Sequence, residues 1–160
     1  MCYSTIEVYL FDWGDTLMVD FPGVPGKMCD WEVVEAIDGA KETLECLSQT
    51  AEIYIATGAA ESTEIEIKRA FERVGLDQFI TGYFCKANLC VSKGSPGFFE
   101  EIIARLGKPV SCIAMVGDSL AKDIEPAAAI GIQPIWFSID GNSDIPNGTK
   151  LIGHLQELCR

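Results

Sequence analysis

Short apolar runs that stop abruptly at polar residues recur along this chain, and this feature constrains its fold more than any other. Three such runs end at Asp12, at Thr57-Gly58 and at Gly117-Asp118. A strand buried on both faces of a parallel sheet reads as a near-continuous apolar run, and side chains just beyond its carboxyl end project into the crevice where open α/β sheets bind ligands. We therefore expect a buried parallel sheet with polar side chains gathered at one edge.

Helical patterns alternate with these runs. Strands are predicted near 5–11, 51–56, 79–84, 111–116 and 132–137, and helices near 40–49, 60–74, 96–106, 119–130 and 149–159. Such alternation is typical of βαβ units, which build a parallel sheet with helices on both faces. The predicted fold class is thus α/β, a three-layer α/β/α, Rossmann-like parallel sheet of about five strands.

The chain length favours one domain. A chain of 160 residues can bury a core of its own, so residues 1–160 are expected to form a single domain. Residues 18–30 are rich in glycine and proline and too irregular for a long helix. We predict that they form a loop or flap over the end of the first strand.

Composition excludes several classes of partner. The net charge of −12 repels nucleic acid backbones and anionic lipid, so neither nucleic acid nor a membrane surface is an expected partner. No apolar run approaches the ~18 residues that a bilayer span needs. The seven cysteines are odd in number and scattered, and no signal peptide pattern is present, which predicts free thiols in a reducing, cytoplasmic compartment.

The polar residues at the predicted sheet edge suit phosphoryl transfer. Asp12 supplies a carboxylate able to attack phosphorus, and Asp118 could share a hard cation with it, because Mg²⁺ prefers oxygen ligands. Thr57 and Lys93 would contact the transferring phosphoryl group by a hydrogen bond and by positive charge. Taken singly, such residues occur more often in turns, in helix caps and as surface charges. The prediction therefore rests on their joint order along the chain.

That order resembles the motifs of the haloacid dehalogenase (HAD) superfamily, which is dominated by Mg²⁺-dependent phosphatases. The similar segments are residues 11–17, 55–58, 93–96 and 116–123. The resemblance implies a sheet of strand order 5-4-1-2-3 and hydrolysis of a phosphate monoester through an aspartyl-phosphate on Asp12. The implied substrate is a phosphorylated small molecule or a phosphoprotein.

The resemblance also assigns roles to single residues. Asp12 would be the nucleophile, with Thr57 and Lys93 as further catalytic residues. The implied Mg²⁺ ligands are Asp12, the Gly14 carbonyl, Asp118 and Asp123, of which Asp123 would orient either Lys93 or a water on the metal. The substrate phosphate would be bound by Thr57, Gly58 and Lys93.

One position departs from the superfamily pattern. Its phosphatases carry a second Asp two residues after the nucleophile, which acts as general acid and base, whereas this chain has Gly14 there and Asp15 beside it. General acid–base help contributes ~10²- to 10⁴-fold to a rate. We therefore predict slow turnover that favours aryl phosphates over sugar phosphates, unless Asp15 reaches inward and substitutes for the missing residue.

Other functions are compatible with these residues. A chain without the second Asp could be a catalytically weak or inactive HAD-like protein that binds or regulates. Dehalogenases and phosphonate hydrolases of the superfamily also lack it, but they carry a helical cap, for which the motif spacing here leaves little room. We therefore expect no substantial cap domain, and an open site that a second subunit could close in a homo-oligomer. A receiver-type signalling domain fits less well, because it places its acidic pair before the phosphorylated Asp.

Overall fold

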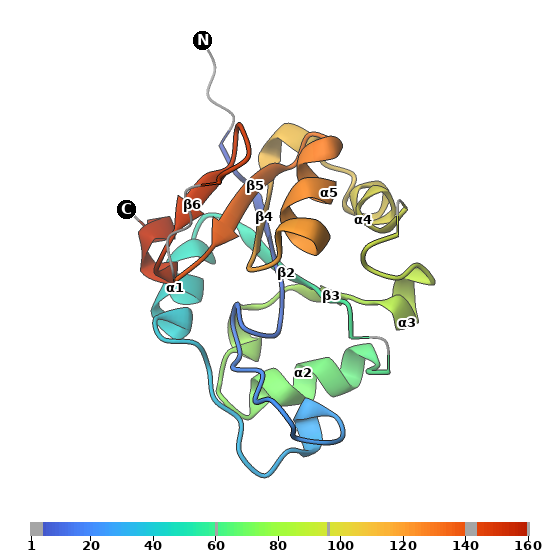
Figure 1. Ribbon diagram of the computed structural model, residues 1–160, viewed down its shortest axis with the longest axis vertical. Coiled ribbons are helices and arrows are strands. Elements are labelled where there is room, and N and C mark those ends of the chain that lie inside the picture. The colour runs from blue at the N-terminus through green and yellow to red at the C-terminus, as the bar shows by residue number, and fades with distance from the viewer. Residues whose placement is uncertain (1–4, 60, 96, 140–143, 160) are drawn as a thin grey trace.

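The computed structural model describes residues 5–59, 61–95, 97–139 and 144–159 (Figure 1). A six-stranded sheet of order β3-β2-β1-β4-β5-β6 forms its centre, and all neighbouring strands run parallel. The strands are β1 Val8–Phe11, β2 Glu52–Ala56, β3 Gly82–Phe84, β4 Ile113–Gly117, β5 Gln133–Phe137 and β6 Lys150–Ile152. The predicted α/β class and the order of the first five strands are confirmed.

Helices and short helical turns connect the strands. The α-helices are α1 Ala40–Leu47, α2 Glu64–Glu72, α3 Lys86–Leu89, α4 Phe98–Leu106 and α5 Glu125–Ala129. The shorter turns are η1 Met28–Asp30, η2 Asp77–Phe79, η3 Val110–Cys112, η4 Leu120–Ile124 and η5 Leu155–Cys159, of which η4 is a π-helix. None of the helices among the described residues is long and apolar enough to cross a membrane.

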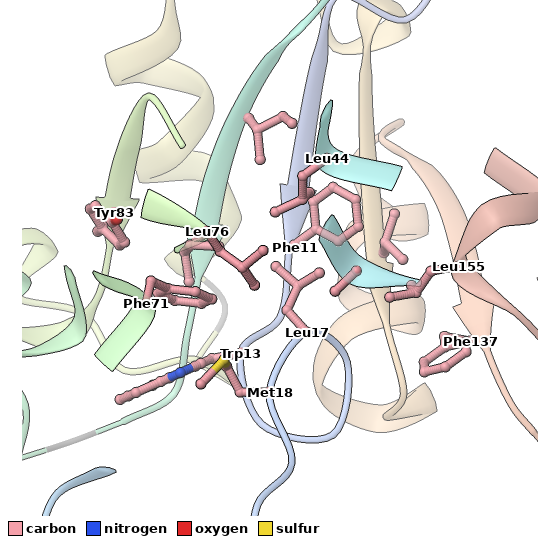
Figure 2. Close-up of a cluster of buried hydrophobic side chains, with 14 of the residues drawn as sticks. Phe11, Trp13, Leu17, Met18, Leu44, Phe71, Leu76, Tyr83, Phe137 and Leu155 are labelled. Carbon is pink, nitrogen blue, oxygen red and sulfur yellow. The ribbon is translucent and has the colours of Figure 1, made fainter. Parts of the chain in front are cut away.

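Both faces of the sheet are covered. Side chains of a strand alternate between the two faces, so neighbouring residues of β1 pack into different clusters. On one face Phe11 of β1 packs in a cluster with Leu44 of α1 and Phe71 of α2 (Figure 2). On the other face Leu10 packs with Phe98 of α4 in a second cluster. Since burying one such side chain contributes about 1.5–3 kcal/mol, these clusters hold β1 firmly in the middle of the sheet. The residue that follows β1 is therefore presented from a rigid base.

Two predicted helices differ from the structure. The helix predicted near 149–159 is wrong, because Lys150–Ile152 forms β6, which pairs with β5, and only η5 follows as a 3-10 turn. A short apolar run suits either state, and here the free edge of β5 decides in favour of a strand. The helix predicted near 119–130 is divided into η4 and α5, with a proline in the first turn of α5.

The other helix predictions hold with shifted ends. Positions 60 and 96, where two predicted helices begin, lie outside the described residues. Helix α2 starts at a capping box, in which the Thr63 side chain accepts from the Glu66 backbone N–H and the Glu66 carboxylate accepts from the Thr63 N–H. Helix α3 was not predicted.

The segment between β1 and α1 forms an irregular loop. Met18 makes isolated bridges to Gly14 and Ala36, and the Trp31 indole N–H donates to the Gly26 carbonyl at 3.1 Å. Among the described residues of this segment, η1 is the only helix, so no cap domain is inserted between β1 and α1. We refer to residues 18–30 as the flap segment.

Candidate active site

Asp12 stands at the carboxyl end of β1 and extends the pairing of that strand by one residue. Its backbone N–H donates to the Val116 carbonyl of β4 at 2.9 Å. Both oxygens of its carboxylate have partners: Oδ1 accepts from Lys93 Nζ at 2.8 Å, and Oδ2 accepts from Thr16 Oγ1 at 3.5 Å. The side chain is 15% exposed, so it reaches the surface of the crevice without being fully solvated.

Lys93 contacts two acidic residues and the carboxyl end of β2. Its Nζ lies 2.8 Å from Asp12 Oδ1, 2.5 Å from Asp123 Oδ1 and 2.8 Å from the Ala56 carbonyl of β2. The contacts to Asp12 and to the Ala56 carbonyl are hydrogen bonds, and the contact to Asp123 is an ion pair. Burial lowers the pKa of Lys93, but the charges of Asp12 and Asp123 outweigh it and raise the pKa overall. Lys93 is therefore a buried cation and not an exposed surface lysine.

Asp118 directly follows β4, and Asp123 lies in η4. One carboxylate oxygen each from Asp12, Asp118 and Asp123 lie within 4.8 Å of one another. Burial raises the pKa of Asp118 to about 7, and a hydrogen bond to Asp12 and the nearby negative charges act in the same direction. Burial also raises the pKa of Asp123, against the opposing effect of Lys93.

The donor set of this cluster fits Mg²⁺. The ion prefers hard oxygen ligands at about 2.0–2.1 Å and is typically bound by a few carboxylates together with waters. Three crowded carboxylates, two of which pair with Lys93, retain excess negative charge, and this charge adds to burial in raising the pKa values of Asp118 and Asp123. The residues of this cluster that could hold the ion are Asp12, Asp118 and Asp123.

Two neighbouring cavities surround these groups. The first, the acidic cavity, measures about 360 Å³. Its lining contains seven of the eight residues predicted for the site: Asp12, Gly14, Asp15, Gly58, Lys93, Asp118 and Asp123. The eighth, Thr57, lines the second cavity of about 380 Å³ together with Trp13 and Trp31, so we name this one the tryptophan cavity. The structure therefore brings the predicted residues to one rim of the sheet.

Thr57 and Asp15 are held by local backbone contacts. The Thr57 N–H donates to the Phe84 carbonyl of β3 at 3.0 Å, and its hydroxyl accepts from the Ala59 N–H at 3.1 Å. Asp15 has a φ of 60°, which is uncommon for a residue with a side chain, and its carboxylate accepts from the backbone N–H of Asp20 at 3.1 Å. Asp15 thus fixes the start of the flap segment.

Asp20 is the site residue that the sequence analysis missed. It lines both cavities, although it lies in the irregular flap segment and follows no strand. No local pattern marks it, because its place depends on how the loop folds back on Gly14.

Gly117, the last residue of β4, leaves no space for a side chain. A Cβ at this position would lie 2.6 Å from the Asp123 Cβ, which is closer than real contacts allow. We predict that Gly117→Ala displaces Asp123 from Lys93 and lowers the free energy of unfolding by about 1–3 kcal/mol, as overpacking does. Urea unfolding measures this.

The matched control is Gly153→Ala, where a Cβ would meet the Ser138 carbonyl oxygen at an ordinary 3.7 Å. This control should unfold near the wild-type midpoint. A Gly117→Ala variant as stable as the control would show that the Asp123 carboxylate is not fixed by packing.

Comparisons with known proteins agree with this architecture. Residues 24–131 match the sequence model of a hydrolase family, the haloacid dehalogenase-like hydrolases. The ribulose-1,5-bisphosphate 5-phosphatase of Halopiger xanaduensis is 32% identical over 114 residues, which cover 71% of this chain and 46% of that protein. The putative HAD-hydrolase YfnB of Bacillus subtilis is 26% identical over 127 residues, which cover 78% of this chain and 53% of that protein. The chain thus spans about half the length of the curated relatives it matches.

Solved structures show the same fold. The crystal structure of YfnB bound to magnesium superposes with a TM-score of 0.77 at 18% identity, covering 96% of this chain and 97% of that chain. A 2-haloacid dehalogenase from Pseudomonas syringae gives a TM-score of 0.75 at 17% identity, with 96% of each chain covered. At such identities the likeness establishes the fold alone. Because the matched family segment covers more than half of its residues, this chain belongs to the haloacid dehalogenase-like hydrolases.

Proposed function

We propose that this protein is a Mg²⁺-dependent phosphohydrolase that cleaves phosphate monoesters through an aspartyl-phosphate on Asp12. The observation that carries the proposal is the contact between the buried Lys93 ammonium and Asp12, beside a cluster of carboxylates suited to Mg²⁺. The similarity to a protein named as a bisphosphate phosphatase supports a phosphorylated substrate.

Asp12 is oriented for attack on phosphorus. Lys93 and Thr16 hold one carboxylate oxygen each, which fixes the plane of the group at the floor of the acidic cavity. Attack forms a bond from an Asp12 oxygen to phosphorus and breaks the bond to the ester oxygen, which leaves as an alcohol. Water then displaces Asp12 from phosphorus, which releases inorganic phosphate. When bound, Mg²⁺ supplies positive charge that offsets the charge of the phosphate.

The phosphate itself would be bound by Thr57, Gly58 and Lys93. Gly58 supports this assignment because it lines the acidic cavity beside Lys93, with only ordinary contact distance between the two residues. Lys93 supplies a fixed positive charge beside the phosphoryl oxygens. This charge stabilises the negative charge on those oxygens as the bond to the leaving group breaks.

The flap segment would shape the site of the leaving group. Gly26, Lys27 and Met28 of this segment line the tryptophan cavity beside Trp13. Lys27 Nζ pairs with Glu66 Oε2 of α2 at 2.7 Å, which ties the flap segment to the helix. The substrate class we propose is a phosphorylated small molecule or a phosphoprotein whose alcohol portion enters the tryptophan cavity, between the flap segment and the stretch that contains Thr57 and Ser62.

Because the first motif lacks its second carboxylate, we expect slow turnover and a preference for esters that need little protonation. Steady-state assays should show faster hydrolysis of 4-nitrophenyl phosphate than of a sugar phosphate, and both should stop when EDTA removes Mg²⁺. The second candidate function is a binding or regulatory protein, which Gly14 favours. Background rates that do not depend on Mg²⁺ would support that role and contradict the enzyme.

Mg²⁺ binding is expected to weaken as the pH falls below about 7. Asp118, whose pKa is raised to about 7, must lose its proton before it binds the ion. For a carboxyl whose folded-state pKa is raised, protonation favours the folded protein, and this stabilisation disappears as the pH rises from 3.8 to about 7. Mg²⁺ should therefore raise the Tm more at about pH 8 than at about pH 6.

Thermal unfolding at both pH values, with and without Mg²⁺, measures this difference. Asp118→Asn should reduce both the Mg²⁺ effect and its pH dependence. An equal Mg²⁺-induced rise in Tm at the two pH values would contradict the prediction.

A further inference from the structure

We propose that the Asp20 carboxylate performs the proton transfer for which the first motif has no side chain at Gly14. This inference rests on the proposed function and names a further catalytic residue for it. Asp20 supplies a proton donor for unactivated esters, which we still expect to be hydrolysed more slowly than aryl esters because the donor comes from the flap segment and not from position 14.

The Asp20 side chain occupies the space beside Gly14. A Cβ on Gly14 would lie 3.3 Å from the Asp20 Cβ, 3.4 Å from its Oδ2 and 3.6 Å from its Cγ. Gly14 does not adopt the left-handed conformation that favours glycine, so its backbone would accept a side chain. The space that a side chain at position 14 would fill is therefore occupied by the Asp20 carboxylate, which belongs to the flap segment.

Asp20 also lies where the two cavities meet. Gly14 and Asp20 are the two residues that line both the acidic cavity and the tryptophan cavity. In the proposed reaction the phosphoryl group lies in the acidic cavity, over Asp12, and the alcohol portion extends into the tryptophan cavity. The ester oxygen connects these two parts, so it lies at the junction. A general acid must reach that oxygen, and Asp20 is placed to do so.

The backbone of Asp20 is fixed while its carboxylate is left available. The Asp20 N–H donates to Asp15 Oδ1 at 3.1 Å, and the Asp15 N–H donates to the Met18 carbonyl at 2.6 Å, so a short turn holds the position. Within the described part of the chain, no hydrogen-bond donor or cation is paired with the Asp20 carboxylate. In this arrangement Asp15 is a positioning residue.

The proton transfers balance over the two steps. As Asp12 attacks phosphorus, the protonated Asp20 carboxyl gives its proton to the departing ester oxygen, which leaves as a neutral alcohol. The resulting Asp20 carboxylate then takes a proton from the water that attacks the aspartyl-phosphate. Phosphate departs, Asp12 regains its carboxylate, and Asp20 is protonated again, so the net reaction consumes one ester and one water.

The test compares kcat/KM for an aryl and an alkyl ester in the full chain with saturating Mg²⁺. The probes are 4-nitrophenyl phosphate and glycerol phosphate, and the variants are Asp20→Asn, Asp15→Asn and Asp12→Asn. Because kcat/KM reports steps up to the release of the alcohol, it isolates the acid role from the later water step. We expect Asp20→Asn to lower kcat/KM about 10²-fold for the alkyl ester and only a few-fold for the aryl ester.

Asp15→Asn is the matched comparison. The amide oxygen of the new side chain still accepts the hydrogen bond from the Asp20 N–H, but the amide group cannot transfer a proton as a carboxyl does. It should keep the wild-type ratio between the two esters. An equal loss on both esters in Asp20→Asn, or a widened ratio in Asp15→Asn instead, would overturn the assignment of Asp20. Hydrolysis that persists in Asp12→Asn would overturn the proposed function itself, and with it this inference.

Discussion

Asp12→Asn should abolish phosphate ester hydrolysis, with kcat lower by about 10⁴-fold or more. The amide is a poor nucleophile, and its nitrogen cannot accept the hydrogen bond that Lys93 donates to Asp12 Oδ1. The measurement is steady-state release of 4-nitrophenol with Mg²⁺ present, on protein whose folding is checked by circular dichroism.

Asp77→Asn is a suitable control, because it removes the same charge at the start of η2, away from both cavities. It should keep kcat within about twofold of the wild type, as expected for a surface change. An Asp12→Asn variant that retained a tenth of the activity would mean that no covalent step passes through Asp12. Equal background rates in the wild type and the variant would favour a binding protein.

Lys93→Met should weaken both catalysis and folding. It removes the cation that neutralises Asp12 and Asp123 and leaves the Ala56 carbonyl without its donor. We expect kcat to fall by about 10²- to 10³-fold, as for loss of a charge-stabilising group. Breaking a buried pair by removing one partner typically lowers the free energy of unfolding by about 3–5 kcal/mol, and Tm should fall by roughly 10 °C for a chain of this size.

The matched control is Lys122→Met, because Lys122 lines the same acidic cavity but is exposed. Its Tm should stay close to that of the wild type, since exposed charges contribute little to stability. Adding Mg²⁺ should restore part of the stability that Lys93→Met loses, because the ion neutralises the same carboxylates. A Tm unaffected by Lys93→Met would contradict the role of Lys93 as the counter-charge of the cluster.

The sheet and most of the site could be predicted because they depend on local patterns with a known geometric consequence. Asp12 and Asp118 directly follow buried apolar runs, and parallel strands bring their carboxyl ends to one rim. The burial of Lys93 has no local signal. The order of the motifs predicted Lys93 as a residue of the site, but nothing around residues 91–96 marks a buried lysine.

The errors occur where distant contacts decide the outcome. Residues 150–152 form a strand because the edge of β5 is free to pair with them, which their own pattern does not reveal. Asp20 reaches the site through the conformation of the flap segment, and no periodicity describes such a loop. Both depend on contacts between parts of the chain that no local window contains.

The attachment of the flap segment to α2 bears on how the loop would respond to salt. Arg73 donates to the carbonyls of Cys29, Trp31 and Glu32, and these bonds, like the Lys27–Glu66 pair, lie at the partly exposed outer side of the loop. Exposed ion pairs contribute up to about 1 kcal/mol each and weaken in salt. Met28 and Trp31 of the same loop are buried in the main hydrophobic cluster, which salt does not weaken. Higher ionic strength should therefore loosen the outer bonds of the loop while its apolar anchors stay in place.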